Sequence, residues 1–217
     1  MAMSRLKPSG RIGDNMKKIL GLVALFVIIV SSCFYFFVRQ PKNIFDEIYQ
    51  ETEETYRTNN ILRHIDGFKI RPDWPNDGEY FAYTPSGKYQ THPEGYKDIS
   101  ISFNFGEGIK GMSIRFERKT NSNITLWYSA HYNIKKKVLQ KELAIFEEPR
   151  QPGQYLDDEE KVRNYLKKYN ITKEDLDKDY DEIVNQKVLK DWCTIYDSKY
   201  SPSNYGEVKI ETQWENW

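Results

Sequence analysis

Four alternating aspartates are the part of this sequence that comes nearest to a metal site: Asp175, Asp177, Asp179 and Asp181. Carboxylates at this spacing open the calcium-binding loop of an EF-hand, which also needs a glycine at its sixth position and a bidentate glutamate at its twelfth. This chain has Tyr180 and Gln186 at those two positions. We therefore interpret the aspartates as the solvated acidic side of a helix and expect no metal ion.

His131 comes nearest to a general base, since it lies beside Trp127 and Ser129 on the polar side of a predicted strand. The sequence places no carboxylate near it, and the motifs of serine hydrolases and zinc proteases are absent. The glycines from Gly106 to Gly111 lack the Lys-Ser/Thr pair of a phosphate-binding loop and indicate a hairpin turn. We predict that the protein is not an enzyme and has no cofactor.

Three consecutive lysines, Lys135–Lys137, stand at the junction of two predicted strands. Such a cluster could contact anionic lipid or teichoic acid. The simpler interpretation is a solvated turn, which is the commoner setting for lysines at a strand junction.

Polar side chains around one tryptophan form the strongest candidate for a binding site. If the strands keep the register that their alternation suggests, nine residues share the sheet face opposite the helices: Ser100, Ser102, Asn104, Arg115, Glu117, Thr125, Trp127, Ser129 and His131. Trp127 is unusual among small polar neighbours, and protein interfaces favour Trp, Tyr and Arg as anchors. We expect a protein-binding face here. The alternative is that a loop or the N-terminal helix covers Trp127 as ordinary core.

Composition limits the class of protein that these residues serve. The chain has 217 residues, with 32 basic and 32 acidic side chains, only two cysteines and three histidines. These counts exclude a disulfide framework and a cysteine-rich zinc module. The neutral total hides an asymmetry, because residues 1–38 carry a net charge of +4 and residues 39–217 carry −4. An acidic main part argues against nucleic-acid binding, which depends on Lys and Arg contacts to phosphate.

Ile19–Val38 is a run of twenty residues without a charge. As a helix it is roughly 30 Å long, which matches the hydrocarbon core of a bilayer. Because the preceding flank is basic, the positive-inside rule places residues 1–18 in the cytoplasm and residues 39–217 outside. We therefore predict a cytoplasmic tail (1–18), a transmembrane anchor (19–38) and an extracytoplasmic α+β domain (39–217).

The apolar run has two other interpretations. A cleavable signal peptide has a shorter apolar region, of about 7–15 residues. A lipoprotein box at Val30–Cys33 would make Cys33 the lipidated N-terminus, but five apolar residues follow it. We favour the uncleaved anchor, with Met16 as an alternative natural start. Cys33 then lies in the membrane and Cys193 far outside it, so the two cannot form a bridge. An exported domain without disulfides fits the surface of a Gram-positive cell.

Strict alternation of apolar and polar residues predicts strands at Asp98–Phe105 and Met112–Glu117. A third strand is expected at Ile124–Tyr132, and a fourth candidate runs from about Lys137 to Phe146. Short polar turns between them indicate an antiparallel meander with one buried face. Shorter strands are expected at 67–71 and 80–83, and a last one at 207–214.

Helix signals flank the meander on both sides. Asn43 can cap one helix, and Asp157 opens a second. Thr172 starts a third with a capping box and the pattern continues to Trp192. The predicted fold class is α+β: a curved antiparallel β-meander with helices on one face, preceded by one N-terminal transmembrane helix.

Several runs in the C-terminal part resemble the TipC family of streptococcal immunity proteins: Lys187–Trp192, Tyr196–Pro202 and Asn204–Lys209, together with Met16–Lys18 and Asn170–Leu176. The likeness spans Met16 to Trp217, and none of these runs is catalytic. It carries no residue-level site onto this chain, so the nine sheet-face residues are assigned to toxin binding by geometry alone.

The resemblance implies that the protein protects its own cell, in competition between bacteria, from a toxin exported by the type VII (Esx) secretion pathway. The toxin of that family is similar to a lipid II phosphatase, and members of the family are similar to single-pass membrane proteins. The acidic domain would match a basic or metal-bearing rim on the toxin, which a charge-reversal series at Glu107, Glu117 and Glu142 tests. The alternatives are an extracytoplasmic envelope enzyme and an accessory subunit of a secretion system.

Overall fold

A computed structural model describes residues 10–55, 68–70, 80–85, 95–104, 109–120, 123–149 and 155–217. The chain separates into two compact units, the first ending at Gln40 and the second running from Pro41 to Trp217. Each unit is described by itself.

The first unit is a single long helix, α1 (Gly10–Arg39). Within it, the 22 residues of Met16–Phe37 are long and apolar enough to cross a membrane, and their side chains are exposed. The predicted span lies within this helix, which also includes the basic flank. A stretch of this length corresponds to roughly 33 Å of helix.

Within the described residues, the second unit contains a seven-stranded sheet whose spatial order follows the chain, β1 to β7. The strands are β1 (Phe68–Ile70), β2 (Tyr80–Pro85), β3 (Tyr96–Asn104), β4 (Gly111–Lys119), β5 (Ile124–Asn133), β6 (Val138–Glu147) and β7 (Lys209–Thr212). Strands β1 to β6 pair antiparallel, which confirms the predicted meander.

The last strand differs from that pattern, because β7 pairs with β6 in parallel. Between them, the run from Glu148 to Val208 carries all the helices that follow the meander. A connection of that length can return the chain to the starting end of the sheet, which a short turn cannot do.

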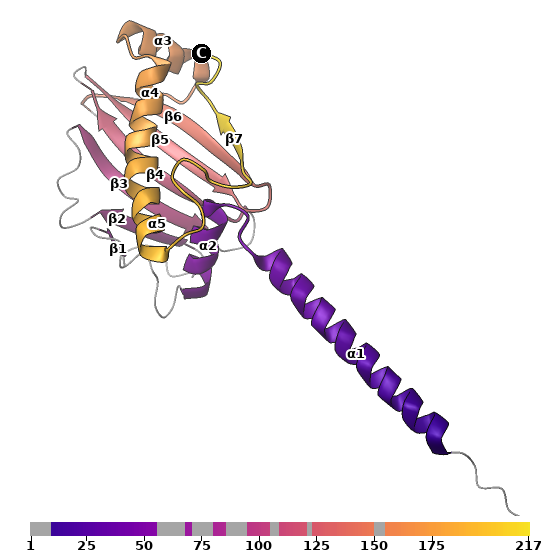
Figure 1. The fold of residues 1–217 in the computed structure, drawn as a ribbon. Coiled ribbons are helices and arrows are strands. Elements are labelled where there is room, and N and C mark those ends of the chain that lie inside the picture. The colour runs from indigo at the N-terminus through magenta and orange to yellow at the C-terminus, as the bar shows by residue number, and fades with distance from the viewer. Residues whose placement is uncertain are drawn as a thin grey trace, which may run out of the picture. The chain divides into compact units, whose positions relative to one another are not determined.

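The helices are α2 (Ile44–Thr55), α3 (Glu159–Lys168), α4 (Lys173–Tyr180), the π-helical η3 (Asp181–Leu189) and α5 (Lys190–Tyr196). The last three follow one another without a break and form one rod that crosses the sheet, with α2 beside it on the same face (Figure 1). Asn43 caps α2 by accepting the amide hydrogen of Asp46, and Thr172 forms a capping box with Asp175. These two predicted helix starts are confirmed. The helix predicted to open at Asp157 has the next residue, Asp158, as its N-cap.

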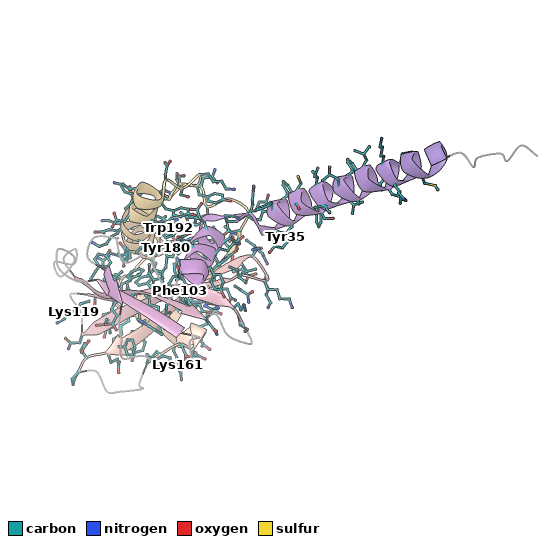
Figure 2. All side chains as sticks on the ribbon, turned by 90° about the horizontal axis from the view of Figure 1, so that it is seen from below. Tyr35, Phe103, Lys119, Lys161, Tyr180 and Trp192 are labelled. Carbon is teal, nitrogen blue, oxygen red and sulfur yellow. The ribbon has the colours of Figure 1, made fainter. Side chains whose placement is uncertain are left out.

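The core fills the space between this helical layer and the sheet, as the side chains of Figure 2 show around Phe103, Tyr180 and Trp192. Aromatic rings make up much of it. Phe116 stacks on Tyr128 with ring centroids 4.5 Å apart. A core rich in tyrosine needs acceptors for its buried hydroxyl groups.

Buried aspartates supply those acceptors. Asp179, with 1% of its surface exposed, accepts hydrogen bonds from the hydroxyls of Tyr96 and Tyr128 and forms an ion pair with Arg118. The prediction that the aspartate run is a solvated helix face is therefore wrong for Asp179. Its side chain points at the sheet because the tyrosines of β3 and β5 require a buried partner there.

Candidate protein-binding face

The sheet face opposite the helical rod is set by the cross-strand register. Ser100 on β3 lies opposite Arg115 on β4, which lies opposite Ser129 on β5. A second row joins Ser102 through Ser113 to His131 in the same way. Side chains that are directly opposite one another across strands point to the same face.

The other predicted residues fall into the neighbouring rows of the same face. Glu117 pairs with Trp127, and Asn104 pairs with Gly111. Thr125 lies two residues before Trp127 on the same strand and shares its orientation. The register therefore brings all nine predicted residues to one face, and their role in binding a toxin stays a prediction.

Three of the nine cannot meet a partner directly because other groups cover them. Thr125 is fully buried, Glu117 is 5% exposed and Ser102 is 8% exposed. The Thr125 hydroxyl donates to the carboxylate of Glu148, 2.9 Å away, in the segment that follows β6. The partly exposed members are the other six: Ser100, Asn104, Arg115, Trp127, Ser129 and His131.

Trp127 lies in an aromatic cluster at the β6 side of this face. Its ring centroid is 6.1 Å from those of both Phe146 and Tyr155, and the Arg115 guanidinium carbon is 5.8 Å from the Trp127 ring centroid. The helix α2 packs on the other face, where Phe45 stacks on Tyr132. The segment at Tyr155 flanks the tryptophan, and Trp127 is partly exposed.

A cleft of about 550 Å³ opens beside the cluster, between β5, β6, the end of β7 and the segment around Tyr155. Its lining combines Arg115 and Trp127 with three exposed carboxylates, from Glu142, Asp157 and Glu211. Sequence reasoning missed these acidic residues as a group, because their convergence depends on β7 lying beside β6. No local sequence pattern indicates that β7 lies beside β6.

His131 is held by a neighbour on β4, since its Nδ1 lies 2.8 Å from the Ser113 hydroxyl oxygen. Burial lowers the pKa of His131 from 6.5, while Glu142 acts to raise it and Arg115 to lower it further. A serine beside a histidine can be a nucleophile and base pair. Here Ser113 is only 5% exposed in the middle of a strand, which favours a positioning role for the hydrogen bond over attack on a substrate.

Metal binding finds no support in the part of the chain that the structure describes, where no group of three or more His, Cys, Asp or Glu residues is arranged to hold an ion. The acidic rim of the cleft consists of separate side chains on β6, on β7 and beside Tyr155.

This geometry defines the class of protein. It is a two-layer α+β domain with an open sheet face, an aromatic cluster and a cleft with an acidic rim. The model of the TipC immunity protein-like family matches residues 17–213. The chain belongs to this family and is an immunity protein. It is similar to the solved structure of TipC2 from Streptococcus intermedius B196, with 42% identity over 82% of this chain and 99% of that one and a TM-score of 0.74. No curated protein matches the chain.

Proposed function

We propose that this immunity protein is anchored by α1 in the cytoplasmic membrane, with residues 39–217 outside, and neutralises a secreted toxin by covering it with the open sheet face. The membership of the immunity family and the apolar length of Met16–Phe37 support this arrangement. The observation that carries the site is Trp127, a large aromatic side chain left partly exposed beside Arg115. Interface hot spots favour these two residue types.

The toxin is a lipid II phosphatase exported by the type VII pathway, as the family resemblance implies. An enzyme that acts on a phosphorylated lipid binds an anionic group and needs basic or metal-bearing surroundings for it. The carboxylates of Glu142, Asp157 and Glu211 complement such a rim in charge. A basic side chain of the toxin can enter the cleft and stack against Trp127 or Tyr155.

Anchoring explains why a membrane helix belongs to this protein. Lipid II is attacked at the membrane surface, and a tethered inhibitor is confined to that same layer. Confinement raises its effective concentration toward the toxin without any additional contact.

A substitution at the tryptophan tests the site. The full chain carrying Trp127→Ala should bind the toxin at least about 30-fold more weakly than the wild type, the effect of losing a hot spot of about 2 kcal/mol. Trp217→Ala is the matched control, because Trp217 donates its indole hydrogen to Glu159 on α3. Dissociation constants and toxin phosphatase activity on lipid II are the readouts.

Equal affinity of wild type and Trp127→Ala would remove the sheet face from the proposal. Co-expression of toxin with chains that carry or lack α1 tests the anchor separately, with loss of protection expected without it. Turnover of lipid II by the purified protein alone would instead support the competing envelope-enzyme hypothesis.

A further inference from the structure

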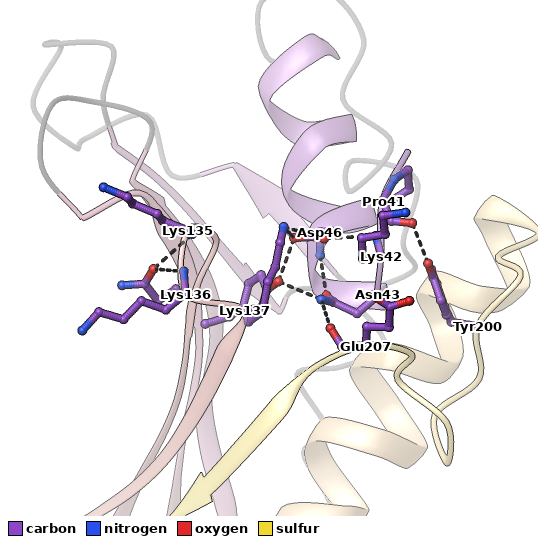
Figure 3. Close-up of polar contacts among 11 residues, drawn as sticks. Pro41, Lys42, Asn43, Asp46, Lys135, Lys136, Lys137, Tyr200 and Glu207 are labelled. Carbon is purple, nitrogen blue, oxygen red and sulfur yellow. Dashed lines mark hydrogen bonds and ion pairs between the residues drawn. The ribbon is translucent and has the colours of Figure 1, made fainter. Parts of the chain in front are cut away.

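The end of the domain at which its chain begins is strongly basic. Lys42, Lys135 and Lys136 gather there (Figure 3), and the carbonyl of Lys110 accepts the amide of Ile134 beside them; we call these four lysines the basic end. Lys110, Lys135 and Lys136 are exposed, and Lys42 is partly exposed. Residues 39–217 carry a net charge of −4 overall, so this local positive charge is opposite in sign to the net charge of the domain.

Specific contacts hold the basic end together. The neighbouring Lys137 donates to both carboxylate oxygens of Asp46, at 2.6 and 2.7 Å, and Asp46 also accepts the backbone amide of Lys42 (Figure 3). The side chain of Asn133 accepts the backbone amides of Lys135 and Lys136 and so fixes the β5–β6 turn.

Lys110 joins the same region through the backbone, because its carbonyl accepts the amide of Ile134 at 3.2 Å. Next to it, Ile109 is 64% exposed. Among the described residues of the domain, only Tyr155 and Ile210 are other large hydrophobic residues with comparable exposure, at 46% and 45%. An apolar side chain among lysines is the composition of a surface that meets a membrane interface.

Two acidic groups described near the basic end are already paired. Asp46 is fully buried and is neutralised by Lys137. Glu211 forms an ion pair with Lys209, which adds no net charge. Lys135 and Lys136, both exposed, present the positive charge of this end to solvent.

Chain connectivity brings this end to the membrane whatever the angle between the helix and the domain. Two residues, Arg39 and Gln40, separate Val38, the last of the predicted span, from Pro41. The three steps from Val38 to Pro41 reach at most roughly 10 Å. Lys42 follows directly, and the contact through Asp46 brings the β5–β6 turn beside it. The lysines therefore lie at the depth of the lipid headgroups if α1 spans the bilayer.

We propose that the basic end rests on the phosphates of anionic lipid headgroups and thereby fixes the orientation of the domain on the membrane. This inference rests on the proposed anchoring by α1. Strand β6 leads away from the basic end, and Glu142 comes five residues after Lys137. At about 3.3 Å per residue the cleft then stands at most roughly 16 Å above the headgroups, within reach of a toxin that works on a membrane-bound substrate.

The test uses the full chain in nanodiscs made of phosphatidylcholine alone or of phosphatidylcholine mixed with phosphatidylglycerol. Lysines are acetylated briefly and the rate at each site is read by mass spectrometry. Lys135 and Lys136 should react roughly fivefold more slowly with phosphatidylglycerol present, the effect expected for a lysine held at an anionic surface. The difference should vanish in about 1 M salt. The exposed Lys161 and Lys167 on α3 are the internal controls.

A double variant, Lys135→Glu with Lys136→Glu, should lose the protection of Lys110 as well, whereas Lys161→Glu with Lys167→Glu should keep it. The turn itself is built by backbone amides, so the double variant folds normally. Equal rates in both lipids for an inserted chain overturn this inference alone. Failure of the chain to enter nanodiscs overturns the anchoring instead. Protection that appears only when teichoic acid is added assigns the lysines to that polymer and also overturns it.

Discussion

The hydroxyl of Tyr128 on β5 donates to the carboxylate of Asp179 on α4 over 2.7 Å. Asp179 also accepts the Tyr96 hydroxyl from β3, at 2.9 Å, and pairs with Arg118 from β4. A single buried carboxylate thus ties three neighbouring strands to the helical rod. Burial also raises the pKa of Tyr96 to about 12, so its hydroxyl stays a donor at ordinary pH.

Replacing Asp179 by asparagine should destabilise the domain by about 2–3 kcal/mol, because the hydroxyls of Tyr96 and Tyr128 lose their charged acceptor while Arg118, 36% exposed, stays hydrated. The free energy of unfolding in urea measures this. Glu174→Gln is the matched control, since Glu174 is exposed in the first turn of the same helix and its loss should change stability by less than about 0.5 kcal/mol. A change at Asp179 no larger than the control would show that the network contributes nothing.

The same residue shows what a sequence pattern can and cannot report. Alternation in β3 to β6 predicted the register of the sheet face, because a slip of one residue would move every apolar side chain of a strand to the wrong face. The direction in which Asp179 points was predicted wrongly. Its neighbours in the run, Asp177 and Asp181, are exposed, and only the distant tyrosines make position 179 different.

The candidate site was predictable to the same extent. Register alone assigned Arg115, Trp127 and Ser129 to one face. The burial of Thr125 and the acidic rim of the cleft depend on the segment after β6 and on the parallel placement of β7. Alternation in a strand carries no information on whether its neighbour runs parallel or antiparallel, so these features needed the three-dimensional structure.

Charge reversal around the cleft should slow toxin binding. The suitable positions are Glu142, Asp157 and Glu211, which are exposed there, whereas Glu117 is buried and reversal there would disturb folding; Glu107 lies outside the described residues. Each change to lysine should lower the association rate several-fold at low salt and leave the dissociation rate nearly unchanged. Stopped-flow measurements over a range of salt concentrations give both rates.

Two comparisons make the series decisive. Reversal of Glu174, at the start of α4 and outside the cleft, should leave the association rate close to that of the wild type. In about 1 M salt all variants should converge, since the screening length falls to about 3 Å. A salt-independent rate, or an equal effect at Glu174, would contradict steering by the acidic rim.

Acid should weaken the folded domain through His131. Burial lowers the pKa of this side chain from its usual 6.5, so the folded protein binds the proton less readily than the unfolded chain does. The stability that depends on neutral His131 is fully present above about pH 6.5 and is lost as the pH falls toward the lower folded pKa. Unfolding free energies at about pH 7.5 and 5.5 measure the loss.

His131→Gln removes this titration and keeps a polar side chain beside Ser113. The variant should therefore lose less stability between the two pH values than the wild type does. Other carboxylates titrate in both proteins and cancel in the comparison. If the two proteins lose stability in parallel, protonation of His131 next to Arg115 does not destabilise the folded domain.

Two glycines allow the conformational cost of an alanine substitution to be compared with its steric cost. Gly206 and Gly95 have nearly the same positive φ, 91° and 90°. A Cβ on Gly206 would lie 2.6 Å from the Lys42 carbonyl oxygen and 2.6 Å from a ring carbon of Tyr200, whereas on Gly95 its nearest neighbour would be 3.3 Å away. Alanine should cost about 1–3 kcal/mol at Gly95, mostly from conformation, because the Lys119 carbonyl oxygen would have to move by only a few tenths of an ångström.

Gly206→Ala should cost more than Gly95→Ala, because the added methyl group must also push apart the backbone at Lys42, whose carbonyl accepts the amide of Glu207. That contact binds the C-terminal segment to the start of α2, so hydrogen exchange should quicken at both places in the Gly206 variant. Urea unfolding of the two variants gives the difference in stability. Equal losses of stability would mean that the backbone at Lys42 moves aside at no cost. The close approach of the C-terminal segment to the start of α2 would then not stabilise this end of the domain.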